Sequence, residues 1–142
     1  YESYELELKV LVSKNDLNQK IQFLGYRTDV EAILDKSDLF FHPSISPDPL
    51  PTVLFEAIKM KVPVVATELG GSLEILDNGK CGLLVPHNNA KKAADLINNH
   101  FEDEELKIFC VENAIELINK HFTPTNFNNN ILNIFKITLA QT

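Results

Sequence analysis

The chain has 142 residues, of which 44% are hydrophobic and 23% are charged, so it is long and apolar enough to bury a core of its own. Its formal net charge of −7 argues against nucleic acid as a main partner, because proteins that bind phosphate backbones are normally basic. No apolar run approaches the roughly 18 residues that a membrane span requires.

The beginning of the chain indicates a helix followed by a strand. Residues 1–16 alternate briefly, as in a strand, but the later apolar residues have helical spacing, which favours a helix. Ile21–Leu24 is a short apolar run that ends at Gly25, as a strand before a turn does. Because the chain opens with Tyr1 inside this structured part, we expect it to be a piece of a longer protein, although an expression product or a processed form would also begin this way.

Strands and helices alternate through the rest of the chain. We predict further strands at Leu39–His42, Pro63–Thr67 and Gly82–Val85. We predict helices at Asp29–Asp35, Val53–Met60, Ser72–Asp77, Ala90–Phe101 and Glu104–Asn119, and a last helix that Pro124 opens. This alternation implies an α/β fold, a Rossmann-like parallel sheet with helices on both faces, in one domain over 1–142 whose segment 123–142 is a C-terminal helix.

The segments that follow the strands are the candidate site, because ligands of parallel sheets bind at the carboxyl ends of the strands. The loop Ser44–Thr52 contains three prolines and opens directly onto a helix, for which Thr52 is the expected N-cap. The free backbone N–H groups of Thr52, Val53 and Leu54 and the helix dipole favour an anion there. An ordinary capped helix is the alternative interpretation.

Two acids, Asp48 and Glu56, are separated by seven residues across this loop and helix. Glu56 lies in an apolar helix that we expect to pack on the sheet, so its carboxylate must be paired or must accept hydrogen bonds. The vicinal hydroxyls of a ribose are natural donors, and a structural salt bridge to Lys59 is the alternative. Asp48 lies between prolines, where an acid that only forms a turn is equally common.

Other groups have weaker signals. Gly70 and Gly71 either let a ligand approach the backbone or form a simple tight turn, and Glu74 after them is best explained as a partner of a helix dipole. Arg27 either lies along a nucleobase or pairs with the nearby Asp29. No histidine lies near a serine or cysteine in a nucleophile arrangement, and no metal constellation is visible, so we expect no metal cofactor. The two cysteines form no C-x-x-C pair, which favours free thiols in a reducing cytosol.

Six segments together carry a family resemblance. They are Phe23–Val30, Leu39–Ser44, Pro47–Ala57, Pro63–Thr67, Gly70–Ile75 and Gly79–Pro86. In this combination the chain resembles the C-terminal, donor-binding lobe of GT-B retaining glycosyltransferases of family 4, the glycosyl transferases group 1, over residues 1–120 or so.

The resemblance implies roles for the candidate residues. The first acid of the family's Glu-x7-Glu motif falls on Asp48, which would hydrogen-bond the donor sugar, and the second falls on Glu56, which would hold the ribose hydroxyls. The backbone of Pro51, Thr52, Val53 and Leu54 would meet the diphosphate, although Pro51 has no N–H, and Gly70 and Gly71 would let the backbone approach the substrate. The base would be bordered by Gly25, Tyr26 and Arg27.

The reaction that the resemblance implies is transfer of a hexose, with retention, from a UDP- or GDP-linked sugar to a glycan or lipid-linked acceptor. It implies no metal, a role in bacterial cell-surface polysaccharide synthesis, and a cytoplasmic protein that can be peripheral to a membrane in its full-length form. Two residues depart from the family pattern. Asp48 is one methylene shorter than the usual Glu, and Leu50-Pro51 replaces the usual Gly.

The family also has parts that this chain lacks: an N-terminal acceptor lobe, an Arg and a Lys for the diphosphate, and two strands between those at Ile21–Leu24 and Leu39–His42. We therefore expect the chain alone to be inactive, and an open sheet edge to invite self-association. Two alternatives remain, a nucleotide-sugar epimerase of GT-B fold, against which the Pro47–Glu56 pattern argues, and a non-catalytic binding domain.

Overall fold

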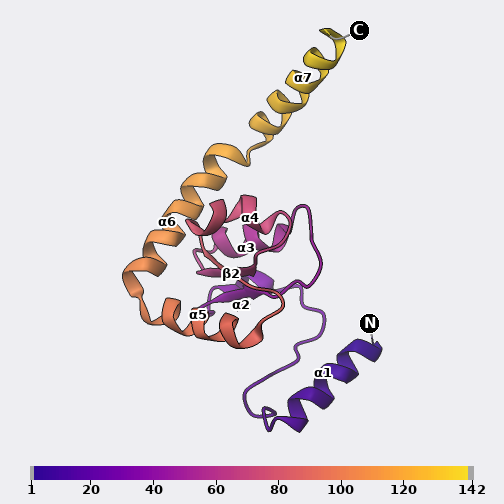
Figure 1. Cartoon of the computed structure of the whole chain (residues 1–142), viewed down its shortest axis with the longest axis vertical. Helices are drawn as coiled ribbons and strands as arrows, with labels where there is room; N and C mark the ends of the chain where they lie inside the picture. The colour runs from indigo at the N-terminus through magenta and orange to yellow at the C-terminus, as the bar shows by residue number, and fades with distance from the viewer. Residues whose placement is uncertain (1, 141–142) are drawn as a thin grey trace. The chain divides into compact units, whose positions relative to one another are not determined.

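The computed structural model describes residues 2–140. The described part of the chain divides into two compact units, on either side of the boundary between Val30 (unit 1) and Glu31 (unit 2). Unit 1 contains helix α1 (Glu2–Lys14), which confirms the helical interpretation of this part of the sequence (Figure 1). Val12 is the buried residue of this helix, and the ammonium of Lys9 lies 2.7 Å from the Glu5 carboxylate and 5.6 Å from the centre of the Phe23 ring.

The strand predicted at Ile21–Leu24 is wrong. The backbone there has no regular structure, and the side chains of Ile21 and Leu24 are exposed. A strand is stable only when a neighbour completes its ladder of hydrogen bonds, and no other extended segment among the described residues of unit 1 pairs with this one. The apolar run thus has the amino-acid composition of a strand but has no partner strand in the structure.

Unit 2 contains the sheet and the remaining helices. The strands are β1 (Phe40–His42), β2 (Val64–Thr67) and β3 (Leu83–Val85). The helices are α2 (Val30–Leu34, which begins at the unit boundary), α3 (Thr52–Lys59), α4 (Ser72–Ile75), the 3-10 turn η1 (Asp77–Gly79), α5 (Ala90–Glu102), α6 (Glu104–His121) and α7 (Pro124–Ala140). Each strand and each α-helix of unit 2 lies within a few residues of its predicted position, and η1 was not predicted as a separate element.

The sheet is parallel throughout, with the strand order β1-β2-β3. Phe40 lies opposite Val64, and Val65 lies opposite Leu83. Since β1 and β3 each pair on one side only among the described residues, the self-association expected through an open edge stays a prediction.

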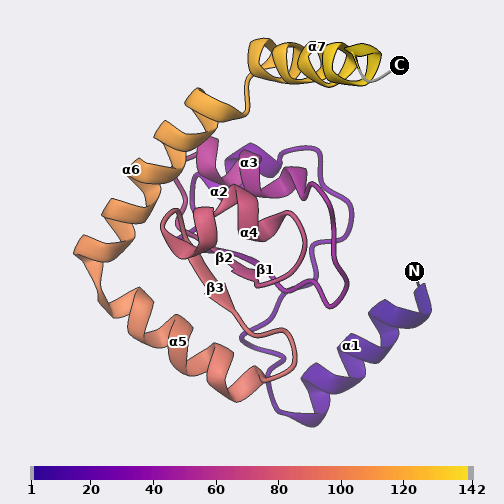
Figure 2. The same cartoon turned by 45° about the horizontal axis from the view of Figure 1, so that its top comes forward.

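Helices cover both faces of the sheet, as predicted (Figure 2). Val64 and Ala66 of β2 point to one face, where they pack with residues of α3, α4 and α6, among them Ile58. Val65 points to the other face and packs with Val85 and with residues of α5. This alternation along a fully buried strand is why the sequence of β2 is apolar at every position but the last.

The helix starts differ in how they are capped. The side chain of Asn89 accepts a hydrogen bond from the N–H of Lys92 at the start of α5, and Asp103 accepts one from Leu106 at the start of α6. The predicted N-cap at Thr52 is wrong, because Thr52 is already the first residue of α3. The N-cap is Pro51, whose side chain makes no cap hydrogen bond, so the ring of Pro51 sets the entry into the helix.

The helices α6 and α7 are separated by a break at Phe122 and Thr123. The hydroxyl of Thr123 accepts a hydrogen bond from the N–H of Asn126, which caps the new helix that Pro124 opens. The predicted apolar face of α7 exists, but α7 has no buried residue. No helix within residues 2–140 is long and apolar enough to cross a membrane.

Candidate functional site

The loop after β1 and the turn after β2 lie against each other at the carboxyl edge of the sheet. The hydroxyl of Thr67, the last residue of β2, donates a hydrogen bond of 2.7 Å to the carbonyl oxygen of Ser44. The N–H of Gly71 donates one of 2.7 Å to the carbonyl oxygen of Asp48. The structure therefore brings together two of the segments that the sequence predicted at this edge.

This contact explains the two glycines. A Cβ on Gly71 would lie 2.3 Å from the carbonyl oxygen of Pro49, and a Cβ on Gly70 would lie 2.5 Å from that of Asp48. Gly70 also has a φ of +53°, which residues with a side chain rarely adopt. Close approach of the proline-rich loop to the backbone is thus sufficient to require glycine at both positions.

Asp48 is exposed, and part of its carboxylate has a structural role. Its Oδ1 accepts a hydrogen bond of 2.9 Å from the N–H of Leu50, which is the turn-forming interpretation of this acid. Its Oδ2 has no partner among residues 2–140. One carboxylate oxygen therefore remains open to a ligand.

The start of α3 leaves two backbone donors without a protein acceptor. The N–H of Leu54 donates to the carbonyl oxygen of Pro51 over 3.1 Å, and Pro51 itself is buried and has no N–H. The N–H groups of Thr52 and Val53 have no acceptor in the described part of the chain. Two amides, not the three that the sequence suggested, can thus meet an anion at this helix end.

The helix α3 packs on the sheet, as predicted, and Glu56 is exposed on it. The buried face of the helix is formed by Leu54, Ala57 and Ile58, and Glu56 lies on the opposite side. No ion pair with Lys59, or with any other side chain of residues 2–140, holds its carboxylate. The carboxylate instead lines a groove of about 810 Å³ and is free to accept hydrogen bonds from a ligand.

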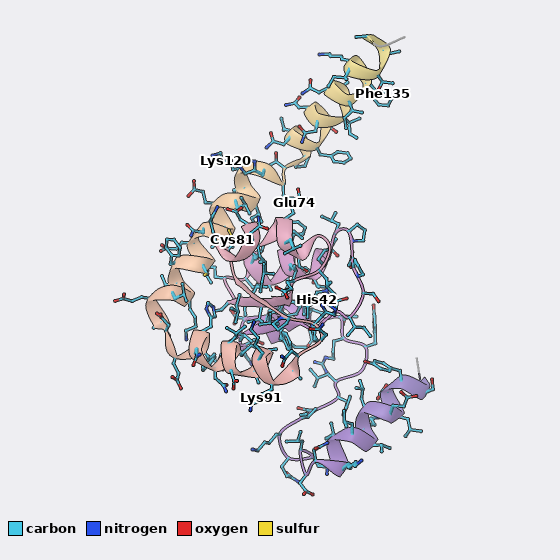
Figure 3. The ribbon with its side chains drawn as sticks, in the orientation of Figure 1. His42, Glu74, Cys81, Lys91, Lys120 and Phe135 are labelled. Atoms are coloured by element: carbon cyan, nitrogen blue, oxygen red, sulfur yellow. The ribbon has the colours of Figure 1, made fainter. Side chains whose placement is uncertain are left out.

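The groove was not foreseen from the sequence. Its walls come from α3, from Glu74 on α4, and from the beginning of α7 around Phe127. Figure 3 shows Glu74 on the part of α4 nearest the start of α7. Glu74 is exposed and shares the groove with Glu56, in addition to lying in the first turn of its short helix. The signal that could have pointed to it is the pair of carboxylates on two neighbouring helices.

His42 ends β1 near the middle of unit 2 (Figure 3). Its Nε2 atom is buried and has no hydrogen-bond partner among residues 2–140. No group of three or more His, Cys, Asp or Glu residues that could hold a metal ion occurs in the same part of the chain.

The residues predicted to border the base lie in unit 1. Gly25 has a φ of +62°, and Tyr26 is 93% exposed. Arg27 forms hydrogen bonds of 2.7 and 2.5 Å with the two carboxylate oxygens of Asp29, and the pairing lowers the pKa of Asp29 below its ordinary value. The predicted alternative for Arg27, a surface ion pair with Asp29, is thus present in the structure. The base-binding role of Gly25, Tyr26 and Arg27 stays a prediction.

Residues 1–117 match the family model described as glycosyl transferases group 1. Among curated relatives, WcaL of Salmonella typhimurium, named as a provisional glycosyltransferase of colanic acid biosynthesis, is 35% identical over 98 residues, which are 64% of this chain and 24% of that protein. The chain therefore spans about a quarter of the length of this relative.

Two solved structures have the same fold. The Anabaena protein Alr3699/HepE in complex with UDP has a TM-score of 0.83 and 28% identity, with 95% of this chain and 37% of that chain covered. A glycosyltransferase from Rickettsia africae has a TM-score of 0.84 and 27% identity, with 100% of this chain and 38% of that chain covered. The Anabaena protein has also been solved with UDP-glucose.

Proposed function

The chain belongs to the glycosyl transferases group 1 family, and we propose that it forms the donor-binding half of a retaining hexosyltransferase. Its α/β fold, a Rossmann-like parallel sheet with helices on both faces, is that of the C-terminal lobe of GT-B glycosyltransferases. In this proposal the acceptor lies in a cleft between this lobe and a second one, and the chain alone binds the donor without transferring its sugar.

The proposed donor is a hexose linked to UDP or GDP, and the proposed acceptor is a glycan or a lipid-linked sugar of bacterial cell-surface polysaccharide synthesis. The name of the Salmonella relative supports the polysaccharide, and the complexes of the Anabaena protein with UDP and UDP-glucose support the donor class.

The observation that carries the proposal is the free carboxylate of Glu56. It is exposed, lines the groove, and has no partner within residues 2–140. A carboxylate accepts hydrogen bonds only, and the two vicinal hydroxyls of a ribose offer two donors at matching spacing. Glu56 would thus hold the ribose and fix the position of the diphosphate relative to the loop.

The start of α3 supports the same assignment. The open N–H groups of Thr52 and Val53, together with the helix dipole, would neutralise part of the negative charge that develops on the leaving diphosphate. The free Oδ2 of Asp48, on the loop that precedes them, would accept a hydrogen bond from a hydroxyl of the donor sugar. In this arrangement backbone amides take the place of a metal ion.

Calorimetric titration of the chain with UDP and with GDP tests the proposal. We expect saturable binding of one nucleotide, and loss of at least about tenfold in affinity on Glu56→Ala, since hydrogen bonds to a charged group contribute about 1.5–3 kcal/mol. Glu105→Ala is the matched control, because Glu105 is an exposed, unpaired carboxylate of α6 within the described residues and lies outside the groove. Equal affinities of both variants would contradict the proposed role of Glu56.

A further inference from the structure

The groove beside Glu56 has an aromatic base. The rings of Phe55 on α3 and Phe122 at the end of α6 lie 5.1 Å apart at an angle of 59° and pack against the core, which fixes them in place. Phe127, on the first turn of α7, also lines the groove and is 66% exposed. The groove thus offers flat apolar surface that is held by the fold, with one further ring open to solvent.

Polar side chains without protein partners surround these rings. Glu56, Lys59, Glu74, Asn128 and Asn130 all line the groove. Within residues 2–140 none of these side chains has a hydrogen bond or an ion pair. Together they offer carboxylate oxygens, amide groups that both donate and accept, and one ammonium.

This set of groups selects among ligand classes. Thr52, whose N–H we assign to the donor diphosphate, also lines the groove. Beyond that diphosphate, two carboxylates against one ammonium disfavour a further phosphate or another anion there. An apolar partner, such as a hydrophobic helix, would bury charged groups without hydrogen bonds, which is costly. A neutral sugar ring satisfies both requirements, since its C–H face can lie on a phenyl ring while its hydroxyls donate to carboxylates and exchange hydrogen bonds with amides.

We propose that this groove binds a neutral saccharide, namely a unit of the glycan that the enzyme extends. The volume of about 810 Å³ lies within the range of about 300–1,000 Å³ that is usual for small-molecule sites. The identification of the saccharide as part of the extended glycan rests on the proposed function. Its identification as a neutral saccharide rests on the groove alone. Glu56, which lines the groove, would then contact both the nucleotide and the bound glycan.

Titration of the 15N-labelled chain with maltose, cellobiose and lactose, followed by NMR, tests the proposal. We expect at least one disaccharide to cause saturable shifts in the amide signals of Asn128 and Asn130. Phe127→Ala and Asn130→Ala should each weaken this binding about 2- to 10-fold, the usual range for one lost contact of this kind. The matched control is Phe135→Ala, since Phe135 lies farther along the same helix, is 62% exposed and does not line the groove (Figure 3).

The outcomes separate this proposal from the proposed function. Absence of saturable shifts with all three disaccharides, or an equal effect of Phe135→Ala and Phe127→Ala, would overturn it. A parallel titration with UDP-glucose distinguishes the source of the sugar, and shifts of the groove amides in that arm alone would assign the groove to the donor and overturn its assignment to the glycan. Binding of UDP is a separate readout. If the chain binds UDP but no disaccharide, the saccharide proposal is contradicted and the proposed function is not.

Discussion

Gly71 and Asp48 are joined by a backbone hydrogen bond of 2.7 Å, from the N–H of the glycine to the carbonyl oxygen of the acid. The turn after β2 therefore supports the proline-rich loop that carries Asp48 and leads into α3. Any change at the turn is expected to move the loop, although Gly71 contributes no side chain to a ligand.

Gly71→Ala tests this support. The backbone of Gly71 has ordinary helical angles, φ −66° and ψ −15°, which alanine adopts readily, so the cost arises from the Cβ that would lie 2.3 Å from the carbonyl oxygen of Pro49. We expect the free energy of unfolding in urea to decrease by about 1–3 kcal/mol. Leu73→Ala, at an exposed position two residues later, should change it by no more than about 0.5 kcal/mol. A Gly71→Ala variant as stable as the parent chain would show that the loop adjusts freely.

The different helix starts predict different costs of losing a side chain. Asn89→Ala and Asp103→Ala each remove a cap hydrogen bond, so we expect each to destabilise the chain by about 1 kcal/mol in urea unfolding. Thr52→Ala should cost far less, because Thr52 is inside α3 and its side chain caps nothing. If Thr52→Ala decreased the free energy of unfolding as much as Asn89→Ala does, Thr52 would have to act as a cap after all.

We expect His100 to make the stability of the chain depend on pH. It is buried, its Nε2 has no partner among residues 2–140, and burial lowers its pKa below the ordinary 6.5, with Lys107 acting in the same direction and Asp103 opposing them. The unfolded chain thus binds this proton more readily than the folded one. The contribution of His100 to stability is complete above pH 6.5 and is lost as the pH falls through the lowered pKa of the folded state.

Urea unfolding at pH values on both sides of 6.5 measures this dependence. His100→Leu should make the curve of stability against pH flatter in this range, because the side chain that titrates is gone. Asn98→Ala, which removes an exposed side chain of α5 that does not titrate, should leave the slope of the curve as it is in the parent chain. The same slope in His100→Leu as in the parent would assign the dependence to other groups.

The two cysteines should resist alkylation in the folded state. Burial, more than the charge of Asp77, raises the pKa of Cys81 to about 11, so roughly one thiol in a thousand is ionised at pH 8. Burial also raises the pKa of Cys110, which the N–H of Gly82 partly offsets. Mass spectrometry after iodoacetamide treatment should show little modification in buffer and full modification in urea. Phe109→Cys, which places a thiol at an exposed position, is the control that should react in both.

The order of helices and strands in unit 2 could be predicted from the sequence because apolar spacing is a local property. The strand expected at Ile21–Leu24 could not, since a strand also depends on a partner elsewhere in the chain. The residue type of Thr52 predicts an N-cap, whereas Pro51 determines where the helix begins.

The site was also predictable only where local patterns in the sequence determine it. The spacing of Asp48 and Glu56 and the position of Gly71 in a Gly-Gly turn after a strand are both visible in the sequence. The exposure of Glu56 follows from which side of α3 packs on the sheet, and the groove follows from the direction that α7 takes after the break at Thr123. No local pattern specifies that direction, so the aromatic base and the amides of Asn128 and Asn130 became visible only in three dimensions.

The order of the strands has a consequence for how the chain acquires its fold. Each strand pairs with the next strand along the sequence. The unit of β1, α3 and β2 can therefore form its strand pairing before α5, α6 and α7 have been synthesised. The entropy lost in closing such short segments is small compared with that of joining distant ones. The sheet can therefore assemble in the order in which the chain is synthesised, and the contact between the proline-rich loop and its supporting turn can form before α6 and α7 complete the groove.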